Sequence, residues 1–80
     1  MGEVIILKRY EFTKDSTAGI LRGLRATARL SQEELANKSG VGLSSIKGYE
    51  NGENVMSLEN AAKLANTFGV NISDLVQAAS

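Results

Sequence analysis

Residues 30–52 read LSQEELANKSGVGLSSIKGYENG, and this stretch predicts two short helices joined by a tight turn. Ser31 is followed three residues later by Glu34, which is the spacing of a capping box at the start of a helix. Gly40 stands where a left-handed residue would end that helix. The stretch therefore predicts a helix, a turn of a few residues, and a second helix.

The second predicted helix covers residues 43–50 and ends before an Asn-Gly pair, which is another helix-stop signal. Ile46 and Tyr49 are three residues apart and are expected to point into the core. Residues spaced i, i+1 and i+4 share one side of a helix. On the exposed side these are Leu43, Ser44 and Lys47.

The sequence around this unit predicts three further helices, which gives five in all. The first is expected from Asp15, Ser16 or Thr17, any of which can cap it, to about Arg29. Its apolar stripe consists of Ile20, Leu21, Leu24 and Ala28. Ser57 is expected to cap the fourth helix, which ends at Gly69. The caps and anchors of a short fifth helix are Asn71, Asp74, Leu75 and Val76.

The first fifteen residues differ from the rest, so we divide the chain into segment 1–15 and domain 16–80. Segment 1–15 predicts an extended strand, because EVIILKRYEF is rich in β-branched and aromatic residues. One face of this strand would carry Val4, Ile6, Tyr10 and Phe12. It could pair with its own copy across a two-fold axis or lie unpaired against the helices. We prefer pairing across a dimer, because a lone apolar edge promotes aggregation.

Composition excludes several classes of protein. The chain has 80 residues, with no cysteine and no histidine, so neither a disulfide nor a zinc site is expected. No apolar run approaches the roughly 20 residues of a membrane span. Without histidine or cysteine, acid–base and nucleophilic catalysis have few candidates. We expect a cytoplasmic protein that is not an enzyme and has no cofactor, no metal and no membrane contact.

The helix–turn–helix stretch resembles the Cro and phage-repressor (XRE-like) family. The likeness extends over roughly residues 20–75, through LRGLRATARLSQEELANKSGV, SIKGYENG and SLENAAKLANTFGVNISDL. It implies an all-α, compact, five-helix repressor-like DNA-binding domain. It also implies a sequence-specific transcriptional regulator, expected to be a repressor of the Cro/C1 type. Such a homodimer would read the major groove of double-stranded DNA with the helix at 43–50.

The same resemblance assigns DNA-contacting positions. The base-reading positions correspond to Leu43, Ser44, Lys47 and Gly48. The phosphate-binding positions correspond to Ser31, Gln32 and Asn51. Lysine can donate to guanine, serine discriminates weakly, and leucine offers only apolar contact. For Leu43 the alternative is a contact with the preceding helix.

The resemblance further implies an ion pair between Arg25 and Glu50 that fixes the first helix against the reading helix. The alternative is two solvated charges. Two departures from the family pattern are visible in this sequence. Gly42 stands where a serine or threonine cap is usual, and residues 53–56 begin with Glu53 where basic residues are usual.

Charge gives mixed support to a DNA-binding function. Nine basic and nine acidic side chains cancel, whereas a DNA-binding domain is expected to be basic. Residues 16–48 carry five basic and two acidic side chains, and residues 49–80 carry one basic and four acidic. An alternative function is the antitoxin of a toxin–antitoxin pair, whose N-terminal strand would bind a protein partner.

Overall fold

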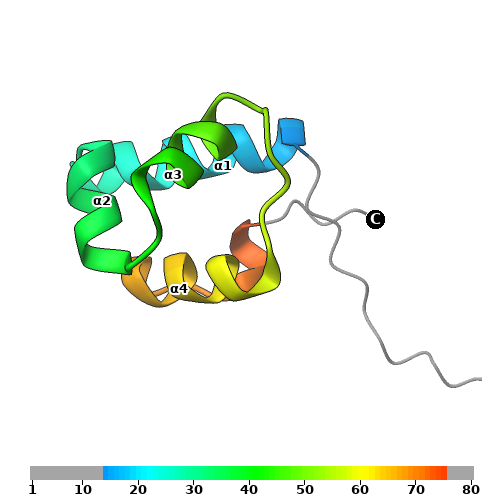
Figure 1. The fold of residues 1–80 in the computed structure, drawn as a ribbon. Helices are drawn as coiled ribbons and strands as arrows, with labels where there is room; N and C mark the ends of the chain where they lie inside the picture. Colours follow the sequence, from blue (N-terminus) through cyan, green and yellow to red (C-terminus); the bar gives the residue numbers. More distant parts are fainter. Residues whose placement is uncertain (1–13, 76–80) are drawn as a thin grey trace, which may run out of the picture.

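The computed structural model describes residues 14–75, with side chains from residue 17 onward. It contains four α-helices and a final one-turn 3₁₀ helix (Figure 1). The elements in chain order are α1 (Lys14–Ala28), α2 (Gln32–Ser39), α3 (Leu43–Glu50), α4 (Leu58–Phe68) and η2 (Ile72–Leu75). The predicted all-α class is therefore confirmed, and the predicted count of five helices is wrong.

The fifth predicted helix is the element that differs. Asn71 and Asp74 do form the predicted local contact, since the N–H of Asn71 donates to Oδ2 of Asp74 at 3.0 Å. The N–H of Asp74 also donates to the carbonyl of Asn71 at 2.9 Å, an i to i+3 bond of the 3₁₀ type. Within the described residues the element is a 3₁₀ helix, Ile72–Leu75, and not an α-helix. Val76, the other predicted anchor of this helix, lies outside the described residues.

The start of α1 also differs from the prediction. Helical backbone begins at Lys14, ahead of all three predicted caps, so the last two residues of segment 1–15 belong to the helix. The strand predicted for Val4, Ile6, Tyr10 and Phe12 lies outside the described residues. Within residues 14–75 there is no strand with which it could pair. The division at residue 15 stays a prediction.

The central helices begin and end where their caps predict. The hydroxyl of Ser31 accepts from the N–H of Glu34 at 3.0 Å, and the Glu34 carboxylate accepts from the N–H of Ser31 at 2.8 Å. This completes the capping box. Gly40 and Gly69 end α2 and α4 with φ of 79° and 71°. Both values lie in the left-handed region, which glycine adopts at little cost.

Each of the five elements contributes a large aliphatic side chain that is fully buried in the core. Their side chains have no exposed surface, and they are Leu21, Leu35, Ile46, Leu64 and Leu75. Burial of such a side chain stabilises a fold by about 1.5–3 kcal/mol. Met56 and Val41, from the two connections that flank α3, complete the same cluster. Even the one-turn η2 is therefore anchored by its last residue.

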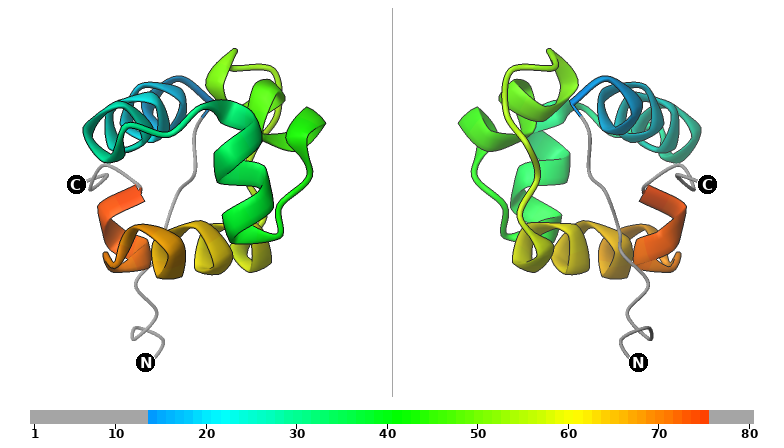
Figure 2. Two further views of the ribbon diagram at one scale, coloured as in Figure 1. Left: turned by 90° about the vertical axis from the view of Figure 1, so that its left-hand side faces the viewer. Right: turned by 90° about the vertical axis from the view of Figure 1, so that its right-hand side faces the viewer.

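The helices are arranged so that α3 stays open on one side. α1 and α3 contact each other, and α2 contacts both α3 and α4 (Figures 1 and 2). α4 lies across the core from α1 and α3, and η2 contacts both α4 and α1 (Figure 1). The inner side of α3 therefore packs against α1 and α2, and its outer side, with Ser44 and Lys47, faces solvent. None of the helices within residues 14–75 combines the length and apolar character needed to cross a membrane.

Arg29 ends α1 in a left-handed conformation, with φ of 59°. Its N–H donates to the carbonyl of Ala26 at 3.0 Å, and the N–H of Leu30 donates to the carbonyl of Arg25 at 3.1 Å. These bonds satisfy carbonyls at the helix end, as a C-terminal glycine normally allows. A side chain in this conformation costs about 1–2 kcal/mol relative to the right-handed one.

Replacing Arg29 with glycine should therefore stabilise the fold. Arg29→Gly removes the left-handed penalty, and the freer unfolded chain offsets about 0.4–1 kcal/mol of that gain. We expect the unfolding free energy in urea to rise by up to ~1 kcal/mol. The matched control is Ala26→Gly, at an exposed position within α1, which should lose about 1 kcal/mol. Equal losses in both variants would contradict this account of the α1 terminus.

Candidate nucleic-acid interface

The last residue of α3 carries a buried carboxylate that is paired with α1. Nε and Nη2 of Arg25 donate to the two carboxylate oxygens of Glu50 at 2.7 and 2.9 Å. The side chain of Glu50 is only 3% exposed, and that of Arg25 is 23% exposed. The structure thus brings together the pair expected from the sequence, in a two-pronged geometry and not as two solvated charges. Such paired bonds fix direction as well as distance.

Arg25 is also bonded to the connection between α1 and α2. Its Nη1 donates to the carbonyl of Leu30 at 3.0 Å. The hydrogen bonds to Glu50 raise the pKa of Arg25, the partial burial opposes this rise, and the charge of Glu50 adds to it. The guanidinium therefore keeps its charge at every pH at which a small domain is normally handled.

Two further side chains reach Glu50. Nε2 of Gln32, the first residue of α2, donates to a carboxylate oxygen of Glu50 at 3.1 Å. Nη1 of Arg22 donates to the backbone carbonyl of Glu50. One residue at the end of α3 is thus bonded to both α1 and α2. We call this set of four residues, Arg22, Arg25, Gln32 and Glu50, the Glu50 network.

The sequence signals for the Glu50 network were incomplete. Arg22 precedes Arg25 by three residues, so both lie on the same side of α1. This spacing places Arg22 beside Arg25, but it does not identify Glu50 as the residue that Arg22 contacts. Gln32 was assigned to phosphate alone, because the sequence does not show how close α2 and the end of α3 lie.

The outer side of α3 carries the residues expected there. Ser44 and Lys47 are exposed, and Leu43 is half-buried. Ile46 and Tyr49 are buried, as their spacing predicts. The hydroxyl of Tyr49 accepts from Nδ2 of Asn60 at 2.8 Å, which satisfies its polar end and links α3 to α4. The helix therefore presents a small polar and basic face on a rigid support.

Gly48 does not share this exposure. It is buried, although its spacing of four residues from Ser44 places it on the same side of α3. A Cβ atom built on Gly48 would lie 3.0 Å from Cγ of Asn54 and closer still to Nδ2 of Asn54. The side chain of Asn54, from the connection between α3 and α4, therefore covers this position. No local pattern in the sequence indicates this contact between Gly48 and Asn54.

The predicted phosphate-binding residues lie at two helix ends. Ser31 is the cap of α2, with its hydroxyl bonded to a backbone N–H, and Gln32 follows it. Asn51 is the exposed residue that ends α3, and its N–H donates to the carbonyl of Lys47 at 2.9 Å. The start of α2 carries a partial positive charge from the helix dipole, which suits an anion. Ser31 and Gln32 thus lie together at the start of α2, whereas Asn51 lies at the end of α3.

The start of α3 is unusual, because Gly42 has no side chain with which to cap it. Gly42 is extended, with φ of −60° and ψ of 144°, and no side-chain bond caps the helix. Amides of the first turn are therefore free to meet an anion or water. Before it, the hydroxyl of Ser39 accepts from the N–H of Val41 at 3.1 Å and closes the turn between the two helices.

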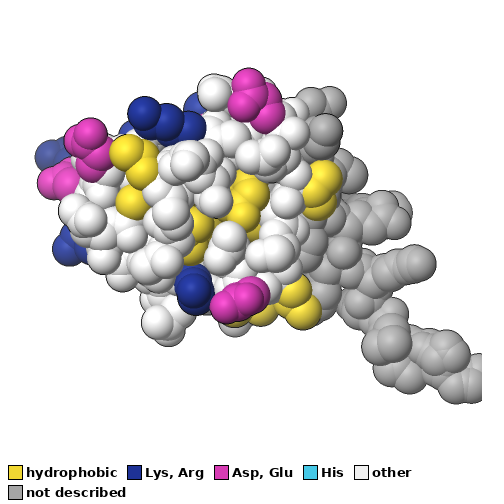
Figure 3. Space-filling model, viewed as in Figure 1, with side chains coloured by type: hydrophobic (Ala, Val, Ile, Leu, Met, Phe, Trp, Pro, Cys, Tyr) yellow, Lys and Arg dark blue, Asp and Glu magenta, His cyan; other side chains and the backbone are white. Residues whose placement is uncertain are grey.

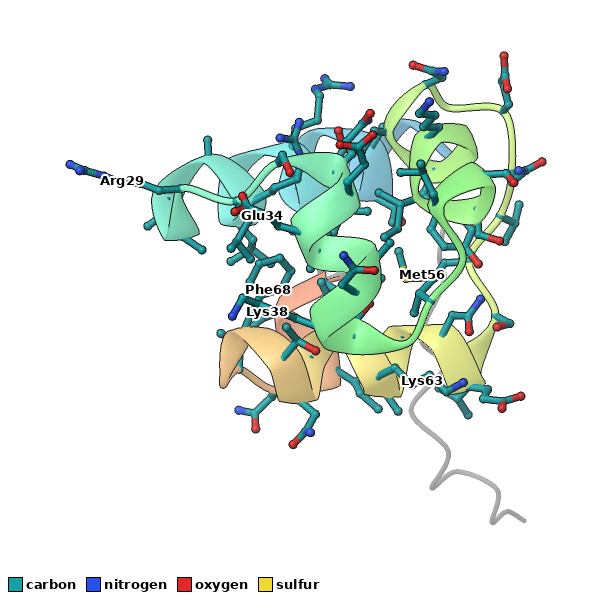
Figure 4. The ribbon with its side chains drawn as sticks, turned by 60° about the vertical axis from the view of Figure 1, so that its left-hand side comes forward. Arg29, Glu34, Lys38, Met56, Lys63 and Phe68 are labelled. Atoms are coloured by element: carbon teal, nitrogen blue, oxygen red, sulfur yellow. The ribbon has the colours of Figure 1, made fainter. Side chains whose placement is uncertain are left out.

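Basic and acidic side chains are interspersed on the surface of the domain (Figure 3). Basic groups follow the upper and left edges of the molecule beside acidic ones (Figure 3). Arg29 points away from the body at the end of α1 (Figure 4). Glu53 is exposed in the connection after α3, where it would repel a phosphate backbone. Within residues 14–75, no group of three or more acidic side chains could hold a metal ion.

Comparison with known proteins identifies relatives of this arrangement. The family model described as "HTH_3: Helix-turn-helix" matches residues 21–75. The chain is 45% identical over 56 residues to the cryptic phage CTXphi transcriptional repressor RstR of Vibrio cholerae, covering 70% of this chain and 50% of that protein. It therefore spans about half the length of that relative.

This chain covers a larger share of a second, shorter relative and of a protein of known structure. An uncharacterised HTH-type transcriptional regulator of Methanocaldococcus jannaschii is 44% identical over 55 residues, covering 69% of this chain and 83% of that protein. The crystal structure of the restriction-modification controller protein C.AhdI from Aeromonas hydrophila is similar with a TM-score of 0.71. That match has 38% sequence identity and covers 80% of this chain and 94% of C.AhdI.

The Glu50 network predicts a large loss of stability when Arg25 is removed. Arg25→Ala leaves a buried carboxylate with Gln32 as its remaining side-chain donor, and breaking a buried pair in this way costs about 3–5 kcal/mol. We expect that loss in urea unfolding followed by circular dichroism. Arg29→Ala, which removes an exposed arginine of the same region, should change stability by less than about 0.5 kcal/mol. Equal small effects in both variants would show that the pair contributes little.

Proposed function

Because this chain belongs to the helix-turn-helix family, we propose that it is a sequence-specific DNA-binding transcriptional regulator that acts as a repressor. The observation that carries the proposal is the outer face of α3. Ser44 and Lys47 are exposed on this face. The buried carboxylate of Glu50, at the end of α3, fixes the helix against α1 through its pair with Arg25. A rigid helix with a short polar face is the shape that enters a major groove.

The proposed base contacts come from the first turns of α3. Lys47 would donate to O6 or N7 of guanine, or to a phosphate beside it. Ser44 can bond several base edges, so it would add little discrimination. Leu43, which is half-buried, would contact a thymine methyl group with its remaining surface.

The proposed phosphate contacts come from the start of α2 and the end of α3. Gln32 and Ser31 lie where the helix dipole favours an anion. Asn51 would approach the neighbouring phosphate. Because Gln32 also donates to Glu50, a phosphate held there would be coupled to the orientation of α3. These contacts would set the register of the protein on DNA without reading its sequence.

We further propose that two copies bind together in the cytoplasm. Two-fold related α3 helices would enter successive major grooves about 34 Å apart on a roughly palindromic operator. The part of segment 1–15 that precedes α1 is the candidate dimerisation strand. Domain 16–80 would then supply the DNA contacts and segment 1–15 the pairing. No catalytic activity, cofactor or metal is part of this proposal.

The antitoxin alternative has weaker support. The relatives named above are described as a repressor, a regulator and a controller protein. These descriptions favour DNA binding as the main activity of this chain. Failure of the purified chain to select DNA by itself would favour a toxin partner for segment 1–15.

Selection of random duplex DNA by the purified chain at low salt tests the proposal. We expect a palindromic site to be enriched. Lys47→Ala should change the preference at particular base pairs, because it removes a base contact. Gln32→Ala should weaken binding about equally across sequences, because it removes a phosphate contact. Binding should also fall as salt rises.

The control for these variants is Lys63→Ala on α4. Lys63 is an exposed lysine, 3.7 Å from Glu59, and such surface pairs contribute little to stability. Its replacement should leave both the selected site and the affinity unchanged. Failure of the unaltered chain to enrich any site, even at low salt, would overturn the regulator proposal and leave the antitoxin alternative.

A further inference from the structure

The connection after α3 folds back onto that helix. Gly52 adopts a left-handed conformation, with φ of 72°, and turns the chain. The N–H groups of Glu53 and Asn54 then both donate to the carbonyl of Gly48, at 2.8 and 3.3 Å. Two consecutive residues of the connection are thus hydrogen-bonded to one backbone carbonyl in the last turn of α3.

The side chain of Asn54 lies in the space that a side chain on residue 48 would occupy. Its Cβ and Cγ atoms lie 3.6 and 3.0 Å from the place where a Cβ of residue 48 would be. Gly48 is buried beneath it, while Asn54 itself remains exposed. The carboxamide of Asn54 therefore lies on the surface of α3 at residue 48, where the glycine has no side chain of its own.

This carboxamide belongs to the same side of the helix as the exposed polar residues. Lys47 and Gly48 follow Ser44 by three and four residues, so both positions adjoin Ser44 on the helix surface. A carboxamide carries a donor and an acceptor side by side, which matches N7 and N6 of adenine in the major groove.

We propose that Asn54 is a specificity-determining base contact, and that Gly48 is the positioning residue that makes room for it. The proposal rests on the proposed DNA-binding function and deepens it. The ligand is an adenine edge in the major groove, read through the loop and not through α3 itself. Asn54 would thus supply the side-chain contact that Gly48 cannot make.

Site selection from random duplex DNA, with three variants, tests this assignment. Asn54→Ala should select a site that has lost its preference at one base pair in each half, with about tenfold or more loss of discrimination there. Asn54→Asp keeps the shape but replaces the donor with an acceptor. It should shift the preference at that same base pair toward cytosine, whose N4 group donates. Preferences at the other base pairs should stay as in the unaltered chain.

Gly48→Ala provides an independent readout, because it does not alter the proposed contact chemically. Its methyl group would occupy the space of the Asn54 amide, which is the far end of an exposed and flexible side chain. The melting temperature should be unchanged or raised, since alanine favours a helix more than glycine does. The base preference should nevertheless be lost at the base pair that Asn54→Ala affects. A merely structural role of Asn54 would not produce this pattern.

Asn66→Ala is the matched control, because Asn66 is an exposed asparagine on α4, across the core from α1 and α3. It should select the site of the unaltered chain. If the unaltered chain selects a site and all three variants select the same one, the Asn54 assignment is overturned while DNA binding stands. A uniform loss of affinity without a change in preference would also overturn it. Absence of any selected site for the unaltered chain would overturn both proposals.

Discussion

A buried carboxylate is the constraint on which the rest of this structure depends. Glu50 is almost fully enclosed, and a charge in that position is costly unless it is paired and hydrogen-bonded. Arg25 supplies the countercharge through two bonds, and Gln32 supplies a third donor. These bonds require the last turn of α1, the start of α2 and the end of α3 to meet at one point. The hydrophobic core brings the helices together, and this point sets their relative orientation.

The same arrangement separates support from recognition. Residues that hold α3 lie behind it, where Ile46 and Tyr49 are buried. The residues proposed to contact DNA lie on the solvent-exposed side of α3. They are Ser44 and Lys47, together with Asn54 of the loop that covers Gly48. Substitutions in front can therefore change the sequence that is read without changing the fold. A small domain can vary its proposed operator in this way while it keeps one core.

Much of the fold could be predicted because its signals are local. Capping boxes and terminal glycines depend on residues three or four apart, and the Ser31–Glu34 box and the turn at Gly40 were found where the spacing placed them. The length of the last element could not be predicted in this way. Asn71 and Asp74 form the same local contact whether one turn follows or several, and the structure has a 3₁₀ turn there.

Predicting the site was harder, because its contacts join residues far apart in the chain. The pairing of Arg25 with Glu50 was expected only through resemblance to a family. Gln32 and the carboxylate that it contacts are 18 residues apart in the chain, and helical periodicity does not predict a contact between residues of different helices. Gly48 was expected among the base-reading positions, because the sequence does not show that the side chain of Asn54 covers it. These contacts exist only once three helices and a loop are assembled.

The most direct test of the account is the affinity of the double variant Arg25→Leu/Glu50→Leu for the DNA site selected by the unaltered chain. Replacing a buried ion pair by apolar residues often costs little stability, so we expect a folded protein. Residue 50 then has no carboxylate to accept hydrogen bonds from Gln32 and Arg25, so these bonds no longer fix the end of α3. The account predicts that affinity falls about tenfold or more at an equal folded fraction. A stable double variant with undiminished affinity would contradict it, and would limit the Glu50 carboxylate to a role in folding.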